Sequence, residues 1–91
     1  MVEERIGEVA HYWPRAHAAE LRVEDAVVRV GDRLRIRGHG HDFVQTVTSI
    51  EVDHRPRNVG HPDEHFAIHV ENPVHERDEV LLVRDTGGPK E

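Results

Sequence analysis

Residues 30–38 read VGDRLRIRG, and residues 42–52 read DFVQTVTSIEV. Leu34 and Ile36 alternate with three arginines, which predicts a strand at 33–37 with one apolar face and one basic face. The preceding Gly31-Asp32 pair predicts a tight turn, because glycine accepts a positive φ and aspartate caps backbone amides. The two stretches therefore indicate a β fold, and they contain no catalytic motif.

Short apolar-alternating segments recur through the rest of the chain, and turn residues bound each of them. We expect strands at 6–13, 18–23, 33–37, 43–54, 65–70 and 79–84. Within 43–54, Phe43 and Val47 occupy odd positions but Ile50 and Val52 occupy even ones, so we expect a β-bulge near residues 48–49. Residues 80–83 are apolar on both faces, which predicts a central or covered strand. A single turn of helix is expected at most near residues 57–63.

Six short strands, one of them long and bulged, predict an all-β fold that leaves no exposed sheet edge. The expected architecture is a small closed six-stranded barrel of Greek-key type. Residues 1–84 form its single domain, since 91 residues leave no room for a second core. Residues 85–91 are polar and include Gly87-Gly88-Pro89, so we expect a flexible, disordered tail.

Composition narrows the class of protein further. The net charge is −6, which is unusual for a nucleic-acid-binding domain. No run approaches the roughly 20 apolar residues of a membrane span, and charged residues at 3–5 interrupt any signal peptide, so no membrane partner is expected. The chain contains no cysteine, which excludes disulfides, thiolate metal sites and cysteine nucleophiles. Because small secreted domains usually need disulfides, we expect a cytoplasmic protein.

Four motifs, in order, carry a resemblance to a known family. They are GEVAHY at 7–12, GDRLRIRG at 31–38, DFVQTVTS at 42–49 and RDEV at 77–80. Together they resemble free-standing translation elongation factor-like small proteins, the second-domain β-barrel of elongation factor Tu, and the C-terminal barrel of collagenase-like peptidases, some of which take part in tRNA modification. Two turns depart from the family pattern: Arg77 stands where the family usually has glycine, and PDEH at 62–65 lacks the usual glycine and valine.

The resemblance implies a barrel that binds and does not catalyse. The chain has no G-x-x-x-x-G-K-[ST] phosphate loop, so it is not a GTPase by itself. Ser49 is its only serine, and no Ser-His-Asp arrangement can be defended. We therefore expect a non-catalytic, cofactor-free module that engages tRNA, rRNA or a protein of the translation or tRNA-modification machinery. Two alternatives stay open: a histidine-rich metal-binding module, and a structural docking partner of a collagenase-like peptidase.

Arginines supply the candidate RNA-binding residues. Arg33, Arg35 and Arg37 would share one strand face at spacings of about 6.6 to 7 Å, close to the phosphate separation of an extended nucleic-acid strand. Arg55 and Arg57 could extend this surface. The alternative is a solvated face whose arginines pair with glutamates on adjacent strands, such as Glu8 and Glu51. The negative net charge and the scarcity of aromatic residues favour this alternative.

Histidines supply the candidate metal ligands. His39, His41 and Asp42 offer two imidazoles and a carboxylate on one turn, the ligand types that zinc or nickel takes. The alternative is an ordinary polar turn between two strands.

Five other histidines are expected to have no metal role. His61, His65 and His69 have helical spacing, but Pro62 and the alternation at 66–70 favour a strand, on which His65 and His69 lie roughly 13 Å apart. From their phase along the chain, we expect His11 and His54 to be half-buried structural histidines.

Overall fold

Ten strands and no helix make up the described part of the chain, so the protein is all-β. The structure is a computed structural model that describes residues 2–38 and 40–84. His39 and the expected tail at 85–91 lie outside the described residues. The strands are β1 (Val2–Trp13), β2 (Ala18–Val23), β3 (Val28–Arg29), β4 (Arg33–Gly38), β5 (His41–Thr46), β6 (Ile50–Val52), β7 (Arg55–Arg57), β8 (Val59–Gly60), β9 (Phe66–His69) and β10 (Glu79–Arg84).

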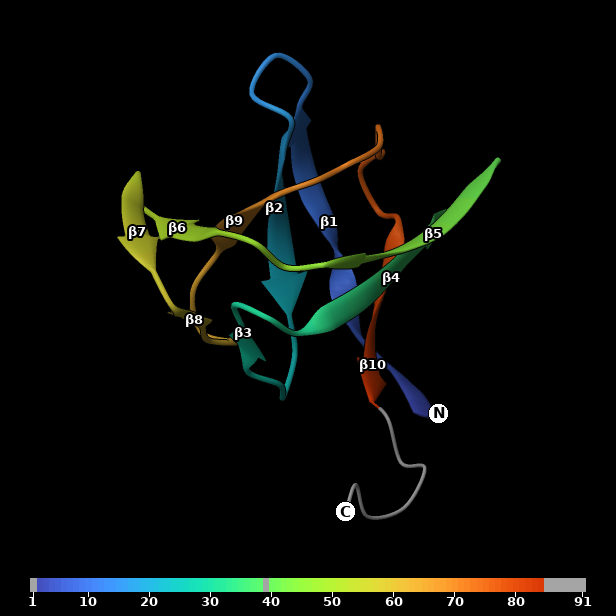
Figure 1. Ribbon diagram of the computed structural model, residues 1–91, viewed down its shortest axis with the longest axis horizontal. Coiled ribbons are helices and arrows are strands. Elements are labelled where there is room, and N and C mark those ends of the chain that lie inside the picture. The colour runs from blue at the N-terminus through green and yellow to red at the C-terminus, as the bar shows by residue number, and fades with distance from the viewer. Residues whose placement is uncertain (1, 39, 85–91) are drawn as a thin grey trace.

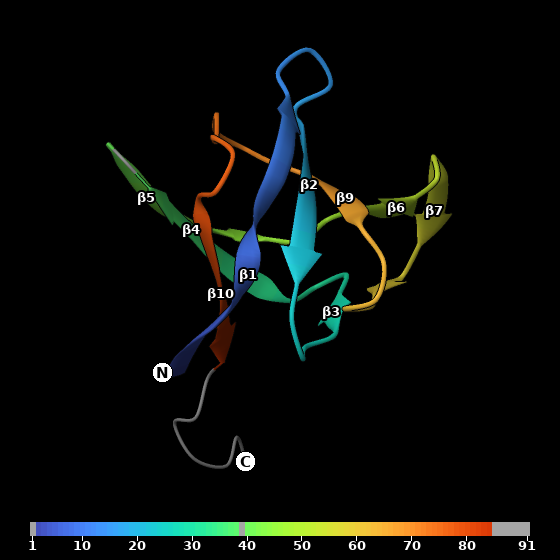
Figure 2. The same ribbon diagram turned by 180° about the vertical axis from the view of Figure 1, so that it is seen from behind.

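Eight of these strands form one curled antiparallel sheet in the order β5-β4-β10-β1-β2-β9-β6-β7, and β3 pairs with β8 beside it (Figure 1). The consecutive strands β5 and β6 lie near opposite ends of this order, because β5 pairs with β4 and β6 pairs with β9 and β7. Residues 47–49 therefore connect strands near the two ends of the sheet order, and this crossing segment passes in front of β2 in Figure 1 and behind it in Figure 2. The sheet wraps around its core, but the described strand ladder does not form a complete hydrogen-bonded ring.

The turn before β4 is tight, as predicted, and its backbone hydrogen-bonds to Val47 in the crossing segment. Gly31 has a φ of 101°, and the Asp32 carboxylate accepts a hydrogen bond from the Arg29 amide at 2.9 Å. The Gly31 amide donates to the Val47 carbonyl and the Val47 amide donates to the Asp32 carbonyl, each at 2.8 Å.

The prediction of one long bulged strand at 43–54 was wrong. The alternation of apolar residues changes phase because β5 pairs with β4, whereas β6 pairs with β9. The two strands therefore bury their side chains as members of separate ladders. The bulges lie in β1, where the register shifts between Arg5 and Gly7 and again between Val9 and His11. The first lets Ile6 and Val9 both face the core although they are three residues apart, and the second does the same for Val9 and Tyr12.

Six strands were too few, and residues 57–63, where at most one helical turn was expected, contain no helix. The strands that were not predicted are β3, β7 and β8, which have only two or three residues each. The hairpin between β6 and β7 turns through Asp53 and His54, whose φ angles are 53° and 64°. Two successive positive φ values are typical of a type I′ turn. The Asp53-His54 pair lacks the glycine that usually identifies such a turn in a sequence.

The core lies inside the curl and consists of aliphatic side chains around Phe66. The predicted bounds of β2 and β10 agree with the structure, and residues 80–83 are buried as expected of a covered strand. β10 lies between β4 and β1, so both of its edges are hydrogen-bonded within the sheet. The largest fully buried side chains are Phe66, Ile6, Leu21, Leu34, Ile36, Ile50 and Ile68. Among the described residues, no helix is long and apolar enough to cross a membrane.

Candidate functional site

The arginines of β4 point away from the core, as predicted, but acidic side chains engage two of them. The Arg35 guanidinium binds both carboxylate oxygens of Asp42, at 2.6 and 2.9 Å, and both of Glu3, at 2.8 and 2.9 Å. Arg37 binds Glu79 at 2.8 Å. Because the Arg35 guanidinium donates to Asp42, the pKa of the Asp42 carboxyl lies below its usual range, and the pKa of Arg35 is raised further.

These contacts resemble the ion-paired alternative more than an RNA-binding surface. The partners differ from those proposed, since Glu8 pairs with Arg22 and the arginines of β4 use Glu3, Asp42 and Glu79. The ion pairs extend across β10 and cover the outward side of Leu81, which is 5% exposed.

The structure does not join Arg55 and Arg57 to the β4 row. Both lie on β7, far from β4 in the sheet order and on the opposite side of the molecule in both views (Figures 1 and 2). Arg57 also binds Glu64 at 3.0 Å. RNA binding by these arginines stays a prediction, and the ion pairs weaken it.

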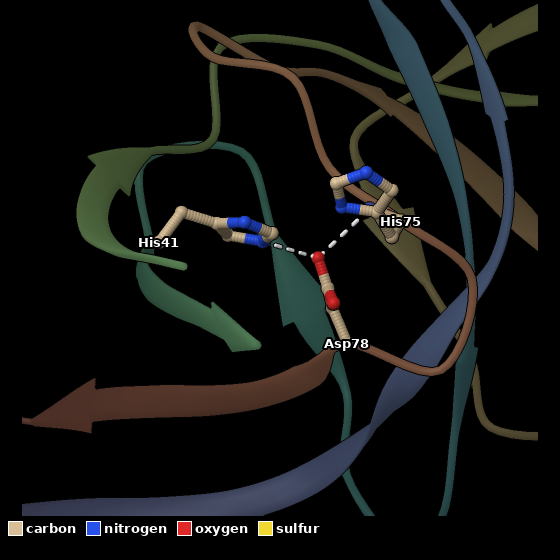
Figure 3. A group of neighbouring side chains, drawn as sticks. All are labelled: His41, His75 and Asp78. Carbon is tan, nitrogen blue, oxygen red and sulfur yellow. Dashed lines mark hydrogen bonds and ion pairs between the residues drawn. The ribbon is translucent and has the colours of Figure 1, made fainter. Parts of the chain in front are cut away.

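A cluster of His41, His75 and Asp78 lies where the start of β5 meets the turn before β10 (Figure 3). One potential ligand atom from each of the three residues lies within 4.8 Å of the others. The His41 Nε2 atom is 2.5 Å from Asp78 Oδ2, and the two imidazole rings stack with centroids 5.3 Å apart. Asp78 is only 5% exposed, and the same oxygen accepts the His75 backbone amide at 2.8 Å.

This cluster replaces the ligand set expected from the sequence. Of that set, His41 belongs to the cluster, whereas Arg35 occupies the Asp42 carboxylate and His39 lies outside the described residues. His75 and Asp78 were not predicted as ligands, because they lie more than 30 residues from His41 in the sequence. The one local signal was the RDEV motif at 77–80, which marked this turn without indicating its contacts.

The other histidines that the structure describes, apart from the cluster, occupy the surface. As predicted, His65 and His69 belong to an extended segment: His69 ends β9 and His65 directly precedes it. The His65 ring binds Glu20 at 2.6 Å. The expectation that His11 and His54 are half-buried was wrong, since both are exposed. The second bulge of β1 turns His11 outward, and His54 occupies the tip of the type I′ turn.

A groove of about 630 Å³ lies over the outer face of β2, β9 and β6. Ala18 and Ala67 lie on its floor, where their small side chains leave the surface hollow, and Trp13, 39% exposed, forms one wall. In the strand register Glu20 lies opposite Ala67, and Ala67 lies opposite Glu51. The two glutamates therefore flank the alanine with Cα atoms about 10 Å apart, two strand spacings.

The groove has a mixed but acidic character. Asp53 adds a third carboxylate to those of Glu20 and Glu51, and Arg15 supplies the one guanidinium. An exposed tryptophan next to carboxylates suits a partner that offers a cationic side chain and some apolar surface. This groove is not evident from the sequence, because its residues come from three separate segments, 13–20, 51–54 and 65–67.

Comparison with known proteins identifies the fold. No protein-family model matches the chain, and no curated protein matches it. Among solved structures, the C-terminal domain of a Geobacillus thermoleovorans protein described as a U32 peptidase aligns with a TM-score of 0.79 and 20% identity, covering 89% of this chain and 93% of that domain. Its selenomethionine variant aligns with a TM-score of 0.78 and 21% identity, covering 85% and 96%. At this identity the match establishes a shared fold, and it agrees with the collagenase-like part of the resemblance noted in the sequence.

Proposed function

We propose that this chain is a non-catalytic docking module that binds the catalytic part of a collagenase-like peptidase. The observation that supports the proposal is the fold match, which extends over nearly the whole of a domain found at the C-terminus of a protein described as a U32 peptidase. A small domain of this fold thus occurs as the C-terminal part of a protein described as a U32 peptidase. A domain of the same fold can serve such a partner through a surface contact.

The groove beside Trp13 is the docking surface in this proposal. Tryptophan is enriched among residues that dominate binding energies, because its ring buries a large area at low entropic cost. Glu20 and Glu51 then receive a lysine or arginine of the partner between them. Such a charge pair fixes the orientation of the partner and accelerates its association.

A catalytic role has little support from the residues. The chain contains no cysteine, and its single serine, Ser49, lies exposed between β5 and β6, outside the groove. The carboxylates of the groove serve electrostatic recognition in this proposal.

A direct binding measurement tests the proposal. Isothermal titration of the purified chain into a collagenase-like peptidase that lacks its own barrel, taken from the same genome, should show one-to-one binding. Trp13→Ala and Glu51→Gln should each weaken that binding at least tenfold. Val44→Ala and Glu71→Gln are matched controls, since Val44 is also 39% exposed and Glu71 is an exposed carboxylate outside the groove. The proposal fails if no binding occurs, or if the control variants weaken it as much as the groove variants.

A further inference from the structure

We propose that His41, His75 and Asp78 form a binding site for a divalent transition-metal ion of the zinc type. This inference is independent of the docking function, because the cluster shares no residue with the groove. It rests on three donors of suitable chemistry that the fold brings together from two distant segments.

The donor set suits zinc. Two imidazole nitrogens and one carboxylate oxygen are ligands that Zn²⁺ binds in tetrahedral sites, whereas Mg²⁺ and Ca²⁺ prefer oxygen ligands. The potential ligand atoms lie within 4.8 Å of one another, so small side-chain rotations can direct all three at one ion. Three protein ligands leave a fourth position for water or for a ligand from another molecule.

Asp78 is held in place before any ion arrives. Its Oδ2 atom accepts the His75 backbone amide at 2.8 Å, and its own amide donates to the His75 carbonyl at 3.1 Å. Its Oδ1 atom lies so close to Gly38 that a Cβ there would be 2.0 Å away. The missing side chain at position 38 thus leaves room for the carboxylate, which is ordered with little freedom left to lose on binding.

The two imidazoles come from segments that the strand ladder does not join directly. His41 begins β5, and His75 lies in the connection between β9 and β10. Their rings stack with an interplanar angle of 29° and centroids 5.3 Å apart. The fold therefore brings two imidazole donors side by side next to the Asp78 carboxylate.

Zinc binding should be stoichiometric and depend on the stacked histidines. In isothermal titration at pH 7.5 with untagged, EDTA-treated protein, ZnCl₂ should bind one-to-one with micromolar affinity, and MgCl₂ should give no binding heat. His75→Ala is the decisive variant, because it removes an exposed ring and keeps the backbone bond to Asp78. We expect it to weaken zinc binding at least tenfold, and His41→Ala to do the same.

His65→Ala is the matched control. His65 also pairs with a carboxylate, that of Glu20, but it does not belong to the cluster of His41, His75 and Asp78. It should bind zinc as the unaltered protein does. Circular dichroism in EDTA should show that all variants are folded. A second measurement uses CoCl₂, whose visible absorption should indicate tetrahedral coordination in the unaltered protein and disappear in His75→Ala. Absence of one-to-one zinc binding, or equal affinity in His75→Ala and His65→Ala, overturns the proposal.

Discussion

The side-chain amide of Gln45 donates a hydrogen bond to the backbone carbonyl of His69 at 2.7 Å. Its oxygen accepts the amide of Glu71 at 2.9 Å. Gln45 belongs to β5, and His69 ends β9, two strands that share no ladder. The Gln45 carboxamide, 3% exposed, thus connects β5 and β9, which the strand ladder does not join.

Replacing Gln45 with methionine should destabilise the fold. The substitution keeps the side-chain volume but leaves one backbone carbonyl and one amide without their partner. We expect the free energy of unfolding to fall by about 1–3 kcal/mol, the cost of leaving buried polar groups unsatisfied. Urea denaturation followed by circular dichroism measures the change. Thr46→Val, an exposed neighbour on the same strand, should change it by less than about 0.5 kcal/mol, and an equal loss in both variants would contradict the assigned role.

Replacing Arg77 with glycine should stabilise the fold. Arg77 has a φ of 73°, a left-handed conformation that costs a non-glycine residue about 1–2 kcal/mol. Glycine removes that strain but adds about 0.5–1 kcal/mol of entropy to the unfolded chain. The net gain should be up to about 1 kcal/mol, visible as a higher midpoint in thermal unfolding. Arg77→Ala retains the strain and should give no gain, so equal stabilisation by alanine would refute the explanation.

The ion pair of Asp42 with Arg35 should make stability depend on pH in the acid range. The Arg35 guanidinium lowers the pKa of Asp42 in the folded protein, so the carboxylate binds its proton more readily when the chain is unfolded. Its contribution is complete above the ordinary aspartate pKa of about 3.9 and disappears as the pH falls through the lower folded value. The difference in unfolding midpoint between the unaltered protein and Asp42→Asn should therefore be constant from pH 7 to 5 and shrink progressively as the pH falls below the ordinary aspartate pKa. A difference that stays constant throughout the acid range would assign the effect to something other than the charge.

The arginine face should bind tRNA weakly. Arg35 and Arg37 already contact carboxylates, so they can release few counterions from a phosphate backbone. In a mobility-shift assay at 150 mM salt, the unaltered protein and the variant with Arg33, Arg35 and Arg37 changed to glutamine should behave alike. A salt-sensitive shift that only the unaltered protein produces would restore the RNA-binding interpretation.

The sequence alone determined the features that depend on neighbouring residues. Alternation placed Leu34 and Ile36 inside and the arginines outside, the apolar run predicted the burial of β10, and Gly31-Asp32 announced its turn. These predictions succeed because side-chain direction in a strand follows from a period of two and from local backbone preferences.

The tertiary structure alone decided which residues meet. Arg35 binds Glu3 and His41 binds Asp78 across 32 and 37 residues of sequence, and Ala67 lies between Glu20 and Glu51 because β9 separates β2 from β6. The bulges of β1 turn His11 and Trp13 outward against the simple alternation. Strand order and register set these contacts. They depend on how the whole core is filled, which no local pattern of residues encodes.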